Sequence, residues 1–245
     1  MKKIIFIITI ILSINTYGQK NLYVYFDTES GQIEKFYVHN KSGIFMLSGT
    51  AKLETVILGN FKSTEVLNVI NDFDHDRIRK VFKIANIQVA TYALREINYP
   101  KNNYYLDDLV KDLPTSINGI SFEYYANYYD DDAVKGKVKS IGGIKIKYFK
   151  DYYLPKEIKG KVSAIGNIKI KLLNDYVHPE TKGKVSKIGD IRIKYYFSYL
   201  HNDINGKVTS IGGYKFSYFD DIYDKRHFGQ FKKLQGSDNR FMLLQ

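Results

Sequence analysis

The sequence of 245 residues contains no cysteine and no tryptophan, and only four prolines. Without cysteine the chain can form neither disulfides nor a cysteine-linked lipid anchor, so its stability has to come from packing and backbone hydrogen bonds. Beyond residue 14, no apolar run approaches the ~20 residues that a membrane-spanning helix needs. These absences exclude a disulfide scaffold and predict no transmembrane helix once the first residues are removed.

Recognisable catalytic motifs are also missing. The sequence has no HExxH, no GxSxG and no phosphate-binding glycine loop, and it lacks the calcium loop of EF-hands. His178 and His201 lie 23 residues apart at equivalent positions, but a zinc site takes three or four protein ligands. The other histidines have no catalytic context: His39, His75 and His227. We therefore predict no enzyme activity, no cofactor and no metal site; a pocket converging on His178 and His201 would favour a hydrolase instead.

The first 18 residues have the pattern of a secretory signal peptide. Lys2 and Lys3 precede an apolar run from Ile4 to Ile14, and small residues follow at Thr16 and Gly18. This pattern predicts an exported protein, located in the periplasm, on the cell surface or in the medium.

A unit of about 23 residues organises the second half of the chain. It reads GKVKSIGGIKIKYF at Gly136–Phe149 and returns at Gly160–Leu173, Gly183–Tyr196 and Gly206–Phe219. The steps between the first glycines are 24, 23 and 23 residues, a period typical of stacked or meandering supersecondary units.

Each unit predicts a β-hairpin. Ile144 to Tyr148 alternate apolar and basic residues, as in a half-buried strand. Gly142-Gly143 before it is a two-residue turn signal, so the partner strand is Lys137–Ile141. A two-residue turn would place Val138 opposite a lysine, and we expect a β-bulge near Lys139 or Ser140 to return Val138 to the apolar face. A longer loop is the alternative explanation. The aromatic residues that follow, such as Tyr148 and Tyr152, are expected to close the core.

These patterns predict an all-β fold, an antiparallel meander of hairpins that forms an elongated, twisted sheet, either open or curled. After the signal peptide we place an N-terminal β segment at residues 19–76, in which Ser63–Phe73 favours a strand over a short helix. Residues 77–245 form the repeat array, since Lys80–Val89 aligns with Lys137–Ile146. The array has an insertion at 94–110, where a binding loop would lie, and a C-terminal capping unit at 229–245.

The excess positive charge belongs to the repeats. Between Ala133 and Phe219 there are 18 lysines and arginines against 6 acidic residues, a balance of +12, whereas the whole chain carries +11. In register, the cations would form rows on the polar face that attract a polyanion; the plainer reading is a solvated face that prevents edge-to-edge aggregation. The first row is Lys145, Lys169, Arg192 and Lys215, the second Lys147, Lys171 and Lys194, and a third Lys137, Lys161, Lys184 and Lys207.

The apolar face of such a sheet needs a cover, because it would be too large a patch for an ordinary monomer. The sheet must curl, pair with a second copy to form a homo-oligomer, or be covered by the N-terminal segment. For the basic face, an anionic glycan or another envelope component is the expected partner; nucleic acid is not expected for an exported protein.

The repeated motif G-K-V-x-x-I-G-x-I-K-I-x-Y-Y resembles repeats in uncharacterised exported proteins of Gram-negative bacteria. In period and hairpin pattern, residues 77–244 are also similar to MORN-type repeats, which build an elongated, twisted antiparallel sheet. The Tyr-x-Gly-x-Trp signature of that family is missing. The resemblance therefore implies an architecture and no activity.

Together the observations predict a non-catalytic exported binding or scaffold protein of the cell envelope. One alternative is a purely structural repeat protein of the cell surface. Another is an outer-membrane β-barrel, whose strands need ~9 to 11 residues, whereas Lys137–Ile141 supplies five.

Overall fold

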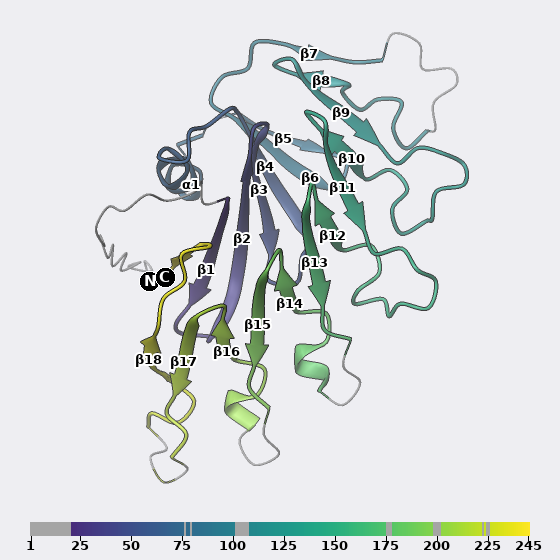
Figure 1. Cartoon of the computed structure of the whole chain (residues 1–245). Helices are drawn as coiled ribbons and strands as arrows, with labels where there is room; N and C mark the ends of the chain where they lie inside the picture. The colour runs from purple at the N-terminus through teal and green to yellow at the C-terminus, as the bar shows by residue number, and fades with distance from the viewer. Residues whose placement is uncertain are drawn as a thin grey trace.

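The computed structural model describes residues 21–75, 77–78, 80–100, 108–174, 178–197, 202–221, 223 and 226–245. In this part the chain forms two open β-sheets and one α-helix (Figure 1). The prediction of an all-β fold is confirmed. Among the residues described, no helix has the length and apolarity to cross a membrane.

Four strands of the N-terminal segment, the hairpin of β5 and β6, and the last strand of the chain build a seven-stranded sheet with the order β19-β1-β2-β3-β4-β6-β5. Its strands pair antiparallel except for β1 with β19 and β4 with β6, which are parallel. The strands are β1 (Leu22–Asp27), β2 (Gln32–Asn40), β3 (Gly43–Ser48), β4 (Leu53–Leu58), β5 (Lys80–Ile84), β6 (Ile87–Thr91) and β19 (Met242–Leu244).

The repeats build a twelve-stranded sheet in which every strand pairs with its neighbours in the sequence, so the predicted antiparallel meander is confirmed. Two short 3₁₀ helices, η1 (Pro179–Thr181) and η2 (Asn202–Ile204), lie in the connections between units. The strands are β7 (Ile97–Asn98), β8 (Ser116–Ile117), β9 (Ile120–Tyr124), β10 (Val138–Ile141), β11 (Ile144–Tyr148), β12 (Val162–Ile165), β13 (Ile168–Leu172), β14 (Val185–Ile188), β15 (Ile191–Tyr195), β16 (Val208–Ile211), β17 (Tyr214–Tyr218) and β18 (Phe231–Gln235).

The two sheets pack face to face, which answers what covers the apolar side of the repeats. Phe36 and Phe45 of the seven-stranded sheet share one core with Ile146 and Ile193 of the twelve-stranded sheet, and all four are buried. The N-terminal segment is therefore the cover. In the part of the chain that the structure describes, the seven-stranded sheet occupies the apolar face through which a homo-oligomer was expected to form.

The opposite face of the seven-stranded sheet carries the helix α1 (Val66–Asp74). The strand predicted for Ser63–Phe73 is wrong. Val66, Val69 and Ile70 recur at helical spacing, are buried, and pack against the sheet through residues that include Ile57. The same apolar residues also fit a strand pattern, so the choice depends on the sheet face that the helix covers.

The hairpin of β5 and β6 corrects a second expectation. Although its sequence aligns with the repeats, it lies at the edge of the seven-stranded sheet, and β6 pairs in parallel with β4. Its register runs without a bulge from Lys80 opposite Thr91 to Ile84 opposite Ile87. Alternation and a short turn specify a hairpin, but they do not specify the sheet that the hairpin joins.

The predicted turn and bulge are both present in the first full unit. Ile141 pairs with Ile144, and Gly142 and Gly143 between them have positive φ values of 56° and 79°. The register of β10 against β9 shifts between Val138 and Ser140, so one extra residue stands in β10. Equivalent shifts occur where β12, β14 and β16 meet the preceding strand.

The bulges also join the two sheets. At the bulges of β12, β14 and β16, the valine donates its backbone N–H to a turn of the seven-stranded sheet. Val162 donates to the Ala51 carbonyl (2.9 Å), Val185 to that of Gly49 (3.3 Å) and Val208 to that of Gly31 (2.9 Å). These bonds fix the positions of these three units along the seven-stranded sheet.

The aromatic residues after each hairpin do not all close the core. Tyr148 and Tyr195 are 7 % exposed and do so, whereas Tyr152 is 82 % exposed. The insertion at 94–110 contributes the edge strand β7, which pairs with β8; residues 101–107 lie outside the described residues.

The C-terminal unit divides between the two sheets. Strand β18 ends the twelve-stranded sheet, whereas β19 pairs with β1 of the other. Between them Asp238 accepts hydrogen bonds from the Gly213 N–H (2.9 Å) and from Arg240 (2.5 Å). The Arg240 side chain and these backbone bonds hold the pKa of Asp238 at about 2.

We expect Asp238→Asn to lower the free energy of unfolding at neutral pH by about 1 kcal/mol, because the ionised carboxylate is the stabilising form. Since the folded pKa is depressed, this contribution is complete above about pH 4 and is lost as the pH falls toward 2. Urea unfolding at neutral pH and across the acid range measures both effects.

Asp108→Asn is the matched control, since the Asp108 side chain is 91 % exposed. Equal acid sensitivity of the Asp238→Asn variant and the unchanged protein would contradict the role given to this carboxylate.

Candidate functional site

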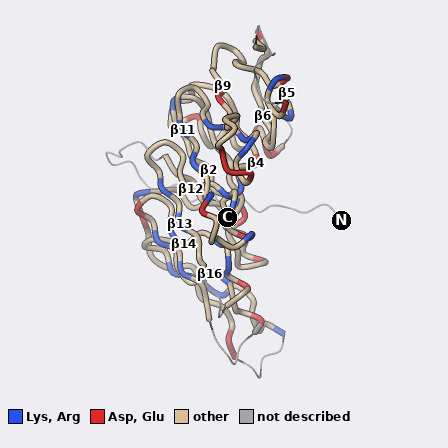
Figure 2. The backbone as a smooth tube through the Cα atoms, turned by 90° about the vertical axis from the view of Figure 1, so that its right-hand side faces the viewer, with Lys and Arg blue, Asp and Glu red and all other residues tan. Residues whose placement is uncertain are grey.

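The outer face of the twelve-stranded sheet carries all seven cations of the first two predicted rows. Each projects from β11, β13, β15 or β17 and is exposed. Figure 2 shows lysines and arginines recurring along this sheet from β11 to β16. We call these seven residues the basic face: Lys145, Lys147, Lys169, Lys171, Arg192, Lys194 and Lys215.

The strand register places these cations in steps across the sheet. Lys187 stands opposite both Lys171 and Arg192, so three positive side chains lie on adjacent strands. In the units on either side, a small residue stands at the position equivalent to Lys187. Ala164 lies opposite both Lys147 and Lys169, and Ser210 lies opposite both Lys194 and Lys215. Sequence reasoning missed Lys187, because its place in the cluster depends on the bulge.

The basic face lacks compensating charge. Within the described ranges, none of its seven members forms an ion pair with a carboxylate. Lys187, which lies between two of them, forms a long ion pair with Asp190, whose side chain is 92 % exposed; the Lys187 Nζ is 4.0 Å from the Asp190 carboxylate. Like charges on adjacent strands cost stability, so this arrangement is not what folding alone would favour.

The third predicted row does not belong to this face. Each of its lysines is partly buried and donates its ammonium to the glycine carbonyl that opens the next unit. The bonds join Lys137 to Gly160 (2.6 Å), Lys161 to Gly183 (3.4 Å), Lys184 to Gly206 (2.9 Å) and Lys207 to Gly229 (2.5 Å). Burial lowers the pKa of all four lysines. We call them the lysine ladder; they connect neighbouring units.

A tyrosine lies under three of the four ladder lysines. The ammonium of Lys184 is 5.4 Å from the ring centroid of Tyr195. The same distance is 5.2 Å for Lys137 and Tyr148 and 5.5 Å for Lys207 and Tyr218. Each of these tyrosines donates its hydroxyl to the valine carbonyl ten residues earlier, at 2.7 to 2.9 Å. The second unit has Leu172 instead, and there the lysine bond is the longest.

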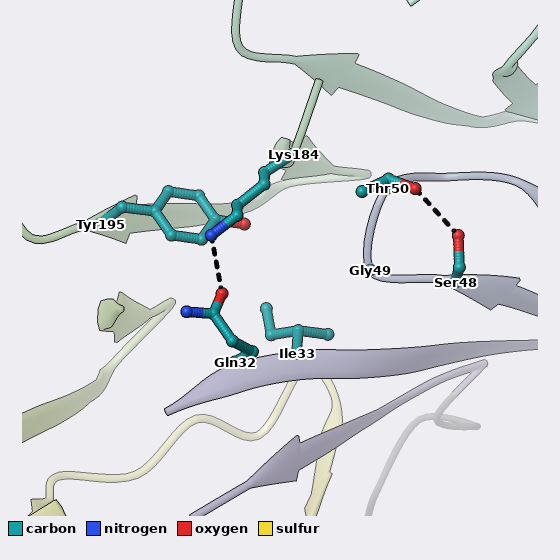
Figure 3. Close-up of a pocket in the computed structure, with 7 residues that line it drawn as sticks. All are labelled: Gln32, Ile33, Ser48, Gly49, Thr50, Lys184 and Tyr195. Carbon is teal, nitrogen blue, oxygen red and sulfur yellow. Dashed lines mark hydrogen bonds between the residues drawn. The ribbon is translucent and has the colours of Figure 1, made fainter. Parts of the chain in front are cut away.

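A pocket of about 200 Å³ opens between the two sheets beside the ladder (Figure 3). Lys184 crosses it and donates to Gln32 Oε1 (2.8 Å), while Gln32 donates in turn to the Gly206 carbonyl (3.1 Å). The pocket is lined by Gln32, Ile33, Ser48, Gly49, Thr50, Lys184 and Tyr195. Lys184 and Gln32 bond to each other across the pocket. These side chains therefore join the two sheets, and few polar groups of the pocket remain free to bind a ligand.

The histidines do not form a common centre in the part described. His178 stacks on Phe197, with ring centroids 4.2 Å apart, and its Nδ1 lies 3.7 Å from Glu180. His201 lies outside the described residues. His39 is 7 % exposed, and its Nε2 is 3.0 Å from the Phe61 carbonyl. The described residues contain no group of three side chains suited to hold a metal ion.

We expect Leu172→Tyr to stabilise the protein by about 1 kcal/mol, because the new ring would lie under Lys161 and its hydroxyl would reach the Val162 carbonyl. Leu172→Phe is the matched control, since it supplies the ring without the hydroxyl. Urea unfolding of both variants measures the two contributions, and a destabilised Leu172→Tyr would show that the second unit has no room for the ring.

Strong alkali should unfold the protein through its buried tyrosines. Burial raises the pKa of Tyr148, Tyr195 and Tyr218, so above about pH 10 the unfolded chain loses protons that the folded chain keeps. Stability then falls by up to about 1.4 kcal/mol per pH unit for each tyrosine. The lysine ladder acts in the opposite direction, but only until unfolded lysines also lose their protons, at about pH 10.4.

Unfolding free energies measured between about pH 10.5 and 11.5 test this effect. Tyr195→Phe should be less stable at neutral pH by about 1 kcal/mol, because the Val185 carbonyl loses its donor, yet it should show a shallower alkaline slope. An unchanged slope would mean that Tyr195 titrates alike in both states.

Comparison with known proteins does not assign this site. No protein-family model, curated protein or solved structure matches the chain. The resemblance to exported repeat proteins thus rests on the sequence motif alone, and a functional assignment has to come from the geometry of the basic face.

Proposed function

We propose that the protein is a non-catalytic, exported binding protein of the cell envelope that holds an anionic polymer, such as a charged glycan, on its basic face. The observation that carries the proposal is the juxtaposition of Lys171, Lys187 and Arg192 on adjacent strands. Lys171 and Arg192 have no carboxylate partner among the described residues, and Lys187 has only the exposed Asp190 at 4.0 Å, so most of this positive charge is left for an external anion to compensate.

The shape of the basic face favours a polymer over a small anion. The cations lie on an open sheet surface and recur with every hairpin, whereas a small ligand is usually held in a concave pocket. Hairpins repeat every two strands, so equivalent cations are ~10 Å apart. A chain with regularly spaced negative groups can contact several of them at once.

The rigid sheet adds to this argument. The lysine ladder and the bulges hold the units in register from the opposite side, so the backbone under the basic face is already ordered before binding. Only the side chains lose freedom when a polymer binds, which lowers the entropic cost of association.

The test compares retention on immobilised heparin across a salt series. In the test variant Lys145, Lys169, Arg192 and Lys215 are changed to Gln. If each exposed contact contributes roughly 0.2 to 1 kcal/mol, the four changes weaken binding by about 1 to 4 kcal/mol, which is about fivefold to several hundredfold. The variant should elute at clearly lower salt.

A control variant with equal loss of charge separates a defined face from overall charge. Lys52, Lys62, Lys80 and Lys83 are exposed elsewhere on the molecule, and their change to Gln should leave elution nearly unaltered. Identical elution of the test and control variants would refute the proposal. The basic face would then serve solubility, as expected of a purely structural repeat protein.

A further inference from the structure

Two adjacent loops present four tyrosines to solvent. The loop at 126–135 connects β9 to β10, and the loop at 150–159 connects β11 to β12. Both loops lie at the same end of these antiparallel strands (Figure 1). Their tyrosines are among the most exposed large side chains of the described protein, and folding does not use them. We call them the tyrosine tips: Tyr128 (83 % exposed), Tyr129 (90 %), Tyr152 (82 %) and Tyr153 (88 %).

Both loops hold their tyrosines in the same way. Asn127 Oδ1 accepts the Tyr129 N–H (3.1 Å), and Asp151 Oδ1 accepts the Tyr153 N–H (3.2 Å), so a side-chain turn begins each tip. The two rings of each tip are almost perpendicular, at 86°, with centroids 5.4 Å apart in one loop and 5.6 Å in the other. The arrangement is therefore built twice.

A lysine of the same loop also contacts one ring of each tip. Lys135 and Lys159 each place their ammonium 5.6 Å from the ring centroid of the first tyrosine of their loop. Lys159 in addition forms an ion pair with Asp131 of the neighbouring loop, at 3.5 Å.

A buried residue anchors each loop: Val134 is 1 % exposed and Ile158 is 2 % exposed. Tyrosines held on an ordered frame bind with little loss of conformational entropy.

The charge of these loops differs from that of the basic face. Residues 126–135 and 150–159 together contain four lysines and five acidic residues, a balance of −1. The carboxylates, which include Asp130 and Asp132, disfavour an anionic polymer and the anionic surface of a membrane. A neutral ligand with many hydroxyl groups suits both the aromatic rings and the acidic side chains.

We propose that the tyrosine tips bind a neutral polysaccharide of β-1,4-linked pyranose sugars, at a site separate from the basic face. Tyrosine rings stack on the C–H faces of pyranose rings, and carboxylates accept hydrogen bonds from sugar hydroxyls. Neighbouring loops are two strands, or ~10 Å, apart, which is about the length of two linked pyranose rings. One extended chain can therefore contact both tips.

The test uses insoluble cellulose, chitin and β-1,4-mannan as probes in pull-down binding with the full-length mature protein. At least one of the three should retain the unchanged protein, and high salt should not release it. Changing all four tyrosines to Ala should weaken binding at least tenfold. Circular dichroism and thermal unfolding should be unaltered, because the side chains contribute nothing to the core.

Two further variants make the result specific. Changing the four tyrosines to Phe keeps the stacking surface and should preserve most of the binding. Tyr99→Ala removes a tyrosine that is 55 % exposed outside both loops and should have no effect. The Gln variant of the basic face should still bind the neutral polymer, so this inference and the proposed function fail independently.

Retention on none of the three polymers would overturn the inference, and so would equal retention of the Ala variant. Sedimentation equilibrium of the unchanged protein and the Ala variant is a second test, because it measures self-association. If the unchanged protein self-associates and the Ala variant does not, the tips bind a second copy of the chain, and the polysaccharide proposal is wrong.

Discussion

The β-bulge in each unit is the constraint on which the rest of the structure depends. An extra residue in the first strand returns the valine to the apolar side and leaves its N–H outside the ladder of its own sheet. An unsatisfied buried N–H is costly, and turns of the seven-stranded sheet accept it at Val162, Val185 and Val208. One local irregularity thus sets both the apolar face of the repeats and their alignment with the N-terminal sheet.

The same geometry separates two kinds of lysine that look alike in sequence. Lysines of the second strand point away from the core and remain exposed, as Lys169 does. The lysine just before the first strand is instead partly buried and reaches the glycine carbonyl of the next unit, as Lys184 does. The first kind is available to a ligand, whereas the second joins the units into one body.

Local patterns were readable from the sequence, and long-range partners were not. The glycine pair and the odd spacing of Val138 predicted the turn and the bulge, because both are decided within a few residues. The helix at Val66–Asp74 and the sheet of Lys80–Ile84 depend on surfaces distant in the chain, which explains why both were misassigned. For the candidate site, the exposed rows followed from alternation alone. Predicting that Lys187 joins the cluster would have required the strand register. Predicting that Lys137 is partly buried would have required the position of the Gly160 carbonyl.

The pairing of β19 with β1 has a consequence for how such a protein can evolve. Stacked repeats usually gain or lose units easily, since each unit contacts only its neighbours. Here another hairpin would widen one sheet without widening the other, leave its isoleucines uncovered, and carry the last strand away from β1. Duplication of a unit would therefore have to be matched by growth of the N-terminal sheet. The width of that sheet therefore limits the number of repeats that the fold can hold.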